Sequence, residues 1–404
     1  MQLFAFIRIS MVLTALSCAV RVQADEPGMD RLILVHYQPW YQAKSPHTPW
    51  GWHWTMDKYD PEQIVAGKRE IASHLYPLIG PYDSADPDVL EYHLLLMKLA
   101  GIDGVIIDWY GLQDFHDYRL LHRNAKELVR SASRLGVKLV ICYEDQTIEK
   151  LTRAGKLAPG DQVPHAVSEI KWLLDNWFPL ENYVRLKGRP VLLSFGQQGL
   201  GPAQWDRCLD QLGQSIAHFP QQPQEQDGAS GFDWPLPDKG LQPNRDFNRS
   251  IGRFRSIDQA IPVAFPRFHD IYEQAGVQRS WGRVQDRGGE TFRETLDGAL
   301  ETGASLVQIA TWNDWGEGTV IEPSEQFGFR DLEIVQQRRR SHLDAEFPYK
   351  PADLRLPFRL FQLRAESSAR SGQRKARLDR VAQWLANGKI EMARVGLEGL
   401  ENER

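Results

Sequence analysis

Two carboxylic acids lie close together in a short stretch that is also rich in tryptophan. This stretch, SLVQIATWNDWGEGTVIEP, spans residues 305–323 and contains Asp314 and Glu317. Cleavage of a glycosidic bond uses two carboxyl groups, one to protonate the leaving oxygen and one to assist attack on the sugar. Tryptophan faces beside them can stack on sugar rings. A solvated acidic turn would explain a single Asp or Glu, but these residue types together indicate sugar chemistry.

The same stretch supplies four side chains that we expect to contact the sugar, which are Trp312, Asn313, Trp315 and Glu322. Residues 305–311 are predicted to form a buried strand, because their apolar positions are too few for a stable helix. Gly316 and Gly318 allow the chain to turn directly after the strand. We therefore expect an active-site loop at the end of a strand.

Strand-like and helix-like runs alternate from residue 30 onward, which is typical of an α/β protein with a parallel sheet. Eight strands would close the sheet into a (β/α)8 TIM barrel, whose chemistry lies at the C-terminal ends of its strands. The predicted strands cover residues 31–37, 104–109, 137–143, 190–195, 261–265 and 305–311. The fifth and sixth strands are not placed, although residues 231–234 are favoured as the end of the sixth. The predicted helices cover residues 86–100, 164–177, 290–301 and 331–342.

The expected strand ends, and the loop after the first of them, carry further candidates for substrate contact. These candidates are His36, Tyr37, Trp40, Trp54, Asp108, Trp109, Tyr110, Glu144, Arg267 and Asp270. The tryptophans at positions 50–54 form either a platform for sugar or an apolar plug over the barrel, and we favour the platform because glycine and proline surround them. Arg267 and Asp270 are as compatible with an internal ion pair as with ligand contact.

The composition argues against several classes of protein. The chain of 404 residues has 53 acidic and 48 basic residues, for a formal net charge of −5. A nucleic-acid-binding protein would show a basic excess instead. No phosphate loop, zinc-ligand spacing or serine elbow is present, so we expect that the protein needs no metal or cofactor. The expected partner is a carbohydrate, and the protein is expected to be a monomer. Two of the three cysteines, Cys142 and Cys208, follow the N-terminal region, and two do not make a disulfide framework; Cys142 is predicted to be a buried free thiol.

The N-terminus resembles a signal peptide. Arg8 precedes an apolar run that is too short for a membrane span, and Val22-Gln23-Ala24 offers a cleavage site before Asp25. We therefore expect residues 1–24 to be removed and the protein to be exported, to the periplasm or the extracellular space, with no stable membrane insertion. Lipidation at Cys18 is the less favoured alternative.

The C-terminal residues 351–404 are rich in charge and carry two helical patterns. A stripe of Leu378, Val381 and Leu385 predicts a helical hairpin that leans on the barrel. The expected organisation is a signal peptide at 1–24, a barrel at 25–350 and a helical extension at 351–404.

Three segments carry a resemblance to a known family. TWNDWGEGTVIEP, GIDGVIIDWYG and VHYQPWY resemble glycoside hydrolases of families 99 and 71, the endo-α-mannosidase and α-1,3-glucanase-like enzymes. The likeness covers residues 31–336. It implies a (β/α)8 barrel that cleaves an α-linked polysaccharide or glycan without a cofactor.

The resemblance also implies roles for the two acids. The family carries two carboxylates, separated by two residues, on the loop after the last strand, and Asp314 and Glu317 match them. The family has Glu at the first position, so Asp314 is shorter by one methylene, about 1.5 Å. In the family the second acid protonates the leaving oxygen, while the first acts as a base on the 2-hydroxyl of the sugar. Configuration is then retained. Alternatively, Asp314 acts on water, and Glu322 or Glu144 replaces it if it does not reach.

Two rival functions remain open at this stage. One is an α-1,3-glucanase-like hydrolase, which shares the barrel and the acids at strand ends. The other is a carbohydrate-binding barrel that has lost turnover. Reducing-sugar release from a panel of α-mannans and α-glucans separates these possibilities.

We predict that the mature protein begins at Asp25, because the small residues at 22–24 have the spacing that signal peptidase uses. N-terminal sequencing of the exported protein tests this. A mature chain that starts at a modified Cys18 would overturn the prediction.

Overall fold

A computed structural model describes residues 31–196, 198–221, 230–235, 237, 260–367 and 372–403. The expected signal peptide lies outside the described residues. From residue 31 onward the described chain forms one compact unit. No helix in the described ranges is long and apolar enough to cross a membrane.

The parallel strands form a closed barrel. In barrel order they are β1 (Leu32–Tyr37), β4 (Gly104–Trp109), β5 (Lys138–Glu144), β7 (Arg189–Phe195), β8 (Ala217–Pro220), β9 (Gly231–Phe232), β10 (Ala260–Ile261) with β11 (Val263–Ala264), and β14 (Leu306–Ile309). A parallel bridge between Gln221 and Phe232 connects β8 to β9. Pairing of Leu32 with Leu306 returns β14 to β1. The prediction of a (β/α)8 barrel is confirmed, and the seventh strand is split in two by Pro262.

The strand that the sequence did not place is β8, the fifth of the barrel. It has four residues and ends at Pro220, and only Ala217 and Phe219 face the core. Such a run is too short to show a period. The sixth strand, β9, occupies the first half of the predicted end at 231–234.

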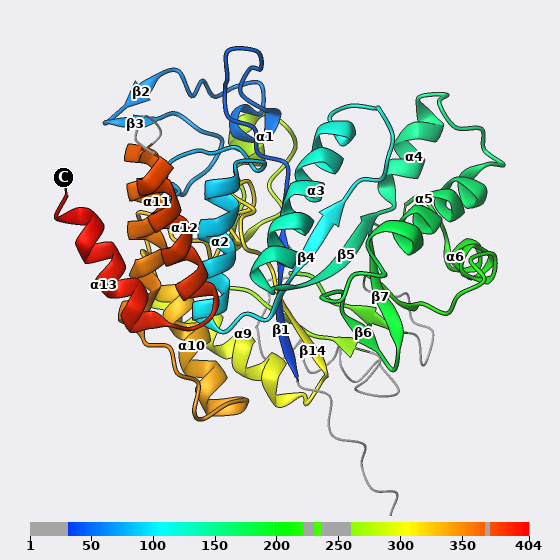
Figure 1. The fold of residues 1–404 in the computed structure, drawn as a ribbon. Helices are drawn as coiled ribbons and strands as arrows, with labels where there is room; N and C mark the ends of the chain where they lie inside the picture. The colour runs from blue at the N-terminus through cyan, green and yellow to red at the C-terminus, as the bar shows by residue number, and fades with distance from the viewer. Residues whose placement is uncertain are drawn as a thin grey trace, which may run out of the picture. The chain divides into compact units, whose positions relative to one another are not determined.

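Most of the helices cover the outside of the barrel, whereas the two helices of four residues, α1 (Trp52–Thr55) and α8 (Tyr272–Ala275), lie in the loops after β1 and β11 (Figure 1). The other helices of this region are α2 (Pro87–Ala100), α3 (Tyr118–Leu135), α4 (Gln146–Arg153), α5 (Gln162–Asn176), α6 (Pro202–Asp210), α9 (Glu290–Glu301) and α10 (Arg330–His342). The 3-10 turns are η3 (Arg287–Gly289) and η4 (Pro351–Leu354). The short paired strands outside the barrel are β2 (Ile64–Val65), β3 (Lys68–Arg69), β6 (Arg185–Leu186), β12 (Phe268–His269) and β13 (Arg283–Val284).

The ends of α2 follow the signals in the sequence. Asp86 caps the helix by accepting a hydrogen bond from the amide of Asp88 at 2.8 Å. Gly101 ends it with a φ of 86°, where a Cβ would lie 2.5 Å from the side chain of Arg339. Only glycine satisfies both constraints. The helix therefore leads into β4 at a fixed position.

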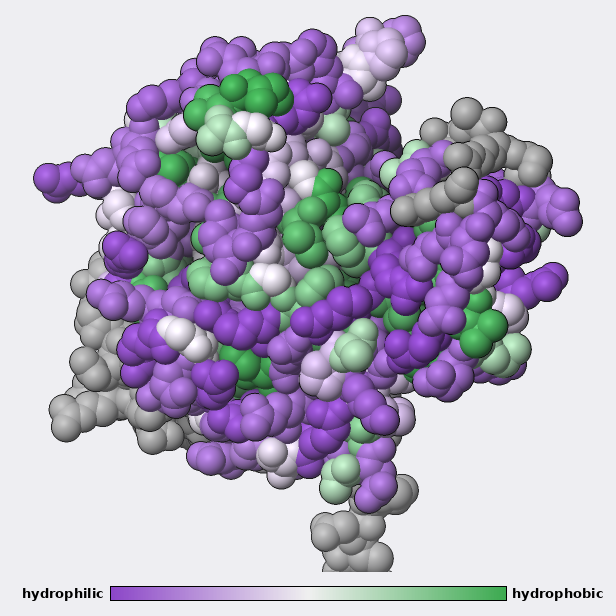
Figure 2. Space-filling model, turned by 90° about the vertical axis from the view of Figure 1, so that its left-hand side faces the viewer, coloured by the Kyte–Doolittle hydropathy of each residue, from purple (hydrophilic) through white to green (hydrophobic). Residues whose placement is uncertain are grey.

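Three further helices form the C-terminal extension, α11 (Arg355–Ser367), α12 (Gly372–Ala386) and α13 (Ile390–Glu401). The predicted stripe of Leu378, Val381 and Leu385 is buried. Figure 1 shows α11 and α12 beside α2, with α13 packed on these two helices, and Arg364 of α11 binds Glu91 of α2 at 2.7 Å. The face of the molecule on that side is mostly hydrophilic, with small separate hydrophobic patches (Figure 2). The extension thus covers one wall of the barrel.

A buried ion-pair network ties the segment after β11 to α10. Arg267 binds Asp286 at 3.0 Å, the carbonyl of Val320 at 2.7 Å, and the buried carboxylate of Asp331. Its guanidinium also lies 3.9 Å from the centre of the Phe327 ring. Arg330 pairs with the same two acids, so Asp286 and Asp331 each lie between two arginines. Removing one arginine from such a buried network leaves its carboxylates with less compensating charge.

We predict that Arg267→Ala lowers the free energy of unfolding by about 3 kcal/mol, because Asp331 would lose one of its two cations inside the protein, with Arg330 remaining, and the carbonyl of Val320 would lose its donor. Urea denaturation measures the change. The control is Arg119→Ala, which breaks an exposed pair with Asp114 and should cost less than ~1 kcal/mol. Equal effects of the two substitutions would contradict the prediction.

Candidate active site

The turn after β14 places the two candidate acids. The side chain of Thr311 contacts the amide of Asp314 at 2.9 Å and the hydroxyl of Thr319 at 2.9 Å, which closes the turn at its base. Gly318 has a φ of 70°, and a Cβ there would lie 2.8 Å from the carbonyl oxygen of His269. Glycine is therefore required at this position for the chain to return toward the barrel.

Asp314 and Glu317 have different surroundings although they share one turn. The Oδ1 atom of Asp314 accepts a hydrogen bond from the amide of Glu317 at 2.9 Å, and the amide of Gly316 also donates to this carboxyl group. The Oε2 atom of Glu317 is buried and has no hydrogen-bond partner, while the side chain of Trp234 bonds to the Glu317 carboxyl. One carboxyl is held by backbone donors, and the other keeps a free oxygen.

These surroundings separate the two acids electrostatically. Burial raises the pKa of Asp314 to about 6, although the amides of Glu317 and Gly316 oppose the rise. Burial, followed by the charges of Asp314 and Asp270, raises the pKa of Glu317 well above its ordinary value. Asp314 therefore loses its proton first. The arrangement therefore favours a carboxylate at Asp314 beside a protonated acid at Glu317.

A second carboxyl pair lies across the cavity at the ends of β4 and β5. Burial and the neighbouring Glu144 raise the pKa of Asp108, to which Glu144 is also hydrogen bonded. Burial raises the pKa of Glu144 to about 7, while hydrogen bonds with Asp108 and Gln146 oppose the rise. Two adjacent carboxyls that share a proton can both donate and accept hydrogen bonds. This pair is suited to holding sugar hydroxyls.

One cavity of about 340 Å³ joins both pairs. The predicted site residues that line it are His36, Trp40, Asp108, Tyr110, Glu144, Asp314 and Glu317. Trp40 stacks on His53, with ring centroids 4.3 Å apart. The volume is within the range of ligand pockets, and its lining is aromatic with several converging polar groups, as in small-molecule sites.

Nine predicted site residues lie away from this cavity, namely Tyr37, Trp54, Trp109, Arg267, Asp270, Trp312, Asn313, Trp315 and Glu322. Trp54, Trp312 and Trp315 were each expected to contact sugar, and this expectation is wrong because all three are fully buried. Trp54 forms part of a plug over the barrel, and its indole donates to the carbonyl of Tyr82 at 2.8 Å. The platform interpretation therefore fails at Trp54.

Glu322, Asn313 and Tyr37 belong to a buried network behind the turn. Glu322 accepts a hydrogen bond from the hydroxyl of Tyr82 at 2.7 Å and lies 3.1 Å from Nε2 of His93. The other ring nitrogen of His93 contacts the Tyr37 hydroxyl at 2.9 Å. Asn313 donates to Tyr82 at 3.1 Å. Because Glu322 faces this network rather than the cavity, it cannot serve as a reserve acid.

The remaining displaced residues also have structural partners. Trp109 packs against Trp177, and its indole donates to Nδ1 of His122 at 3.1 Å. Arg267 forms ion pairs with Asp286 and Asp331, so the internal ion pair is the correct one of the two interpretations of this residue. Asp270 accepts from the amide of Trp281 at 2.8 Å, so it shapes the loop that carries Trp281 instead of contacting ligand.

Sequence reasoning missed part of the cavity wall. The lining residues not assigned to the site are Gln38, Tyr41, Trp52, His53, Met56, Gln146, Lys150, Phe195, Trp234, Tyr272, Val277, Gln278, Trp281 and Gly316. Trp52, which lies within the stretch at 50–54 favoured as a platform, is 40% exposed, and Trp281, for which no role was predicted, is 52% exposed. The only available signal for Trp281 was its position beside glycine. Tyr272 had none, since it lies in a helix of four residues.

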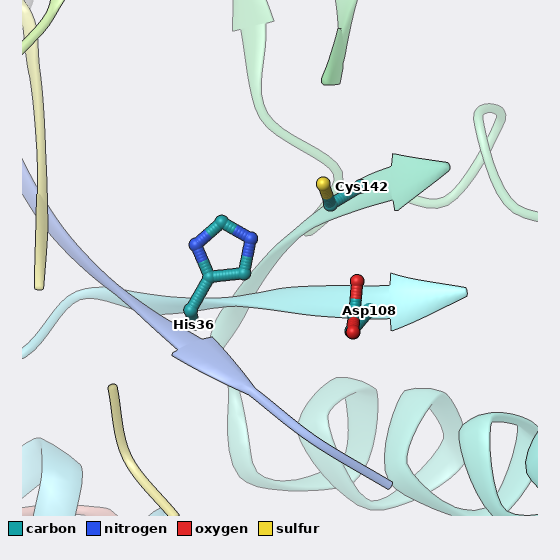
Figure 3. Close-up of side chains that lie close together, drawn as sticks. All are labelled: His36, Asp108 and Cys142. Atoms are coloured by element: carbon teal, nitrogen blue, oxygen red, sulfur yellow. The ribbon is translucent and has the colours of Figure 1, made fainter. Parts of the chain in front are cut away.

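One group among the described residues could hold a metal ion. His36, Asp108 and Cys142 each offer a ligand atom, and these atoms lie within 4.8 Å of one another (Figure 3). They come from the adjacent strands β1, β4 and β5. All three side chains are buried, and both described cysteines are free, as expected for Cys142.

Comparison with known proteins gives consistent results. The model of "Glycosyl hydrolase family 99" matches residues 28–222. A human glycoprotein endo-alpha-1,2-mannosidase-like protein is 32% identical over 318 residues, which cover 71% of this chain and 64% of the human protein. The mouse glycoprotein endo-alpha-1,2-mannosidase is 23% identical over 340 residues, covering 75% and 70% of the two chains.

The fold agrees with a solved relative. The GH99 endo-alpha-mannosidase from Bacteroides thetaiotaomicron superposes with a TM-score of 0.58 at 17% identity, covering 79% of this chain and 98% of that one. Fold and relatives together define a glycoside hydrolase built on a TIM barrel. More particularly, this chain is similar to glycoside hydrolase family 99, so the resemblance to that family seen in the sequence is confirmed.

We predict that Glu317→Gln stabilises the protein by an amount that grows as pH rises. The pKa of Glu317 is raised in the folded state. Above about pH 4, where an unfolded glutamate releases its proton, the folded protein still holds one, so stability falls with rising pH. Gln removes this cost. The melting-temperature difference between variant and parent should be larger at pH 7 than at pH 4.5.

The matched control is Glu325→Gln, which changes an exposed carboxyl outside the cavity. Melting curves of Glu317→Gln that follow the parent in parallel at every pH would show that burial of Glu317 does not hold its proton.

Proposed function

We propose that this protein is an exported endo-α-mannosidase-like hydrolase that cleaves an α-linked glycan with Glu317 as the acid and Asp314 as the base. The observation that carries the proposal is the contrast between the two carboxyls of one turn. Asp314 is held as an acceptor by backbone amides, whereas Glu317 is buried with a free oxygen, and both line the same cavity.

The proposed reaction follows from this contrast. Glu317 gives its proton to the glycosidic oxygen, which leaves with the pair of electrons of the broken bond. Asp314 takes the proton of the sugar's own 2-hydroxyl, whose oxygen attacks the anomeric carbon. This attack closes a small ring between the 2-oxygen and the anomeric carbon. Water then opens the ring at the anomeric carbon, with Glu317 taking the proton of the water and Asp314 returning the proton to the 2-oxygen. The two displacements together retain the configuration.

The position of Asp314 supports this role in spite of its shorter side chain. The amide of Glu317 donates to Oδ1 and fixes the carboxyl group in the cavity, and the pKa of about 6 favours Asp314 as a carboxylate at neutral pH. A base whose pKa is near the working pH combines availability with strength. The names of the mouse and human relatives support an α-mannoside as the substrate.

The walls of the cavity support action on a glycan. Trp52 and Trp281 present exposed aromatic faces at its rim, and the Asp108 and Glu144 pair offers hydrogen bonds to hydroxyls. Sugar rings are recognised by this combination of an apolar face and polar edges. Export is supported by the signal-like N-terminus alone.

We predict that Glu317→Gln reduces hydrolysis of an unactivated α-mannoside at least ~100-fold, because Gln cannot supply the proton that the leaving oxygen needs. Substrates with an activated aryl leaving group should lose much less. Asp314→Asn should impair both kinds of substrate, since it removes assistance to attack whatever the leaving group. The measurement is kcat/KM on both kinds of substrate, with reducing-sugar release from α-mannans and α-glucans.

Glu325→Gln again serves as the control and should behave like the parent. A Glu317→Gln variant as active as the parent on unactivated substrate would exclude Glu317 as the acid, and Glu144 would be tested next. A parent that binds these glycans but releases no sugar would favour the binding-barrel alternative.

A further inference from the structure

Three neighbouring strands bring nitrogen, oxygen and sulfur donors close together, and two of the three residues, His36 and Asp108, line the cavity (Figure 3). Asp108 on β4 stands directly opposite Cys142 on β5 in the parallel register. His36 on β1 pairs with Ile106, two residues before Asp108 and on the same face of β4. The strand register therefore directs all three side chains into the barrel interior.

The hydrogen bonds around His36 fix which ring nitrogen is free. Nδ1 of His36 lies 3.0 Å from Oε1 of Gln308. The amide nitrogen of Gln308 donates to the carbonyl of Asp233 at 2.6 Å, so its oxygen must face the histidine. Nδ1 then carries the proton, and Nε2 keeps its lone pair. An imidazole that donates from one nitrogen to an amide oxygen is the usual arrangement of a metal-binding histidine.

Two of the donor atoms are buried without a partner. Nε2 of His36 and Oδ1 of Asp108 make no hydrogen bond, and the residues are only 1% and 4% exposed. Buried polar atoms nearly always have a hydrogen-bond partner, so two unpaired atoms close to the Cys142 thiol require an explanation. A bound cation would satisfy both of them at once.

We propose that His36, Asp108 and Cys142 form a binding site for a thiophilic divalent cation of the Zn²⁺ class. The donor set of imidazole, carboxylate and sulfur suits Zn²⁺, whereas Ca²⁺ and Mg²⁺ take oxygen ligands. Zinc bonds of about 2.0–2.3 Å would place ligand atoms roughly 3.3–3.8 Å apart in a tetrahedron. The three ligand atoms now lie within 4.8 Å of one another, so small rotations of the side chains would bring them to these separations.

The site opens toward the cavity on one side. His36 and Asp108 line the cavity, whereas Cys142 is fully buried and is not part of its wall. Three protein ligands leave a fourth position that faces the space where a sugar would lie. A bound ion would also draw Asp108 away from Glu144, with which it is hydrogen bonded. The ion therefore occupies the site as an inhibitor rather than as a cofactor, and this consequence rests on the proposed function.

The first experiment measures binding alone. The purified full chain is titrated with Zn²⁺ by calorimetry and with Cd²⁺ by ultraviolet absorbance, where a cadmium–thiolate bond gives a charge-transfer band. We expect one ion per chain and a band that is lost in Cys142→Ser, with Zn²⁺ affinity reduced at least ~10-fold. Asp108→Asn keeps the side-chain shape and should weaken Zn²⁺ binding as well, which covers the case that Cys142→Ser does not fold.

The matched control is Cys208→Ser, which removes the other described free thiol on α6. Its band and affinity should equal those of the parent. A band that survives in Cys142→Ser, or is lost in Cys208→Ser, overturns the proposal, as does the absence of Zn²⁺ binding to the folded parent.

The second experiment measures inhibition. Glycan hydrolysis by the parent should fall on addition of Zn²⁺ and return on addition of a chelator, and Cys142→Ser should require at least ~10-fold more Zn²⁺ for the same loss. If the parent hydrolyses no glycan, the proposed function fails while the binding result stands. Equal sensitivity of parent and Cys142→Ser would overturn the inhibitory role.

Discussion

The buried hydrogen bonds of Tyr82 hold the active-site turn against the rest of the molecule. Its hydroxyl accepts from Asn313 and from the indole of Trp315, at 3.1 and 3.3 Å, and donates to Glu322. One phenol thus touches three positions of the segment that carries Asp314 and Glu317. Because none of these groups reaches water, each depends on the others for its hydrogen bonds. The direction of both candidate acids depends on this contact.

The site also concentrates carboxyl groups that water would otherwise solvate. Asp108, Glu144, Asp314 and Glu317 all have raised pKa values for which burial is the largest cause. The folded chain accepts this cost because neighbouring acids share protons and backbone amides support one of them. Perturbed groups of this kind cluster where proteins do chemistry. The free-energy cost of burying these carboxyl groups is offset by the apolar surface that the large barrel core buries.

The sequence was informative where local rules decide the outcome. Asp86 and Gly101 delimit α2 as capping chemistry predicts, and the position of Asp314 and Glu317 after an apolar strand led to the correct end of the barrel. It was misleading for Trp54, Trp312 and Trp315. Tryptophan is suited both to a core and to a sugar platform, so its exposure depends on what covers it.

That cover comes from residues distant in the chain, which no local pattern reveals. Tyr82 accepts hydrogen bonds from the indole of Trp54, 28 residues away in the chain, and from that of Trp315, 233 residues away. Conversely, Trp281 stays free because Asp270 binds the backbone of its loop. The fold class was predictable because periodicity repeats along the whole chain, whereas the walls of the cavity are decided by single long-range contacts.

The amide of Glu317 is itself a ligand of the Asp314 carboxyl, so the two acids move as one piece. Many of the aromatic wall residues, among them Trp40, Trp52 and Trp281, belong in contrast to separate loops after β1 and β11. In related barrels the rim loops can therefore change, and with them the sugar that is recognised, while Asp314 and Glu317 keep their relative positions. The parts that set specificity are thus separate from the parts that react.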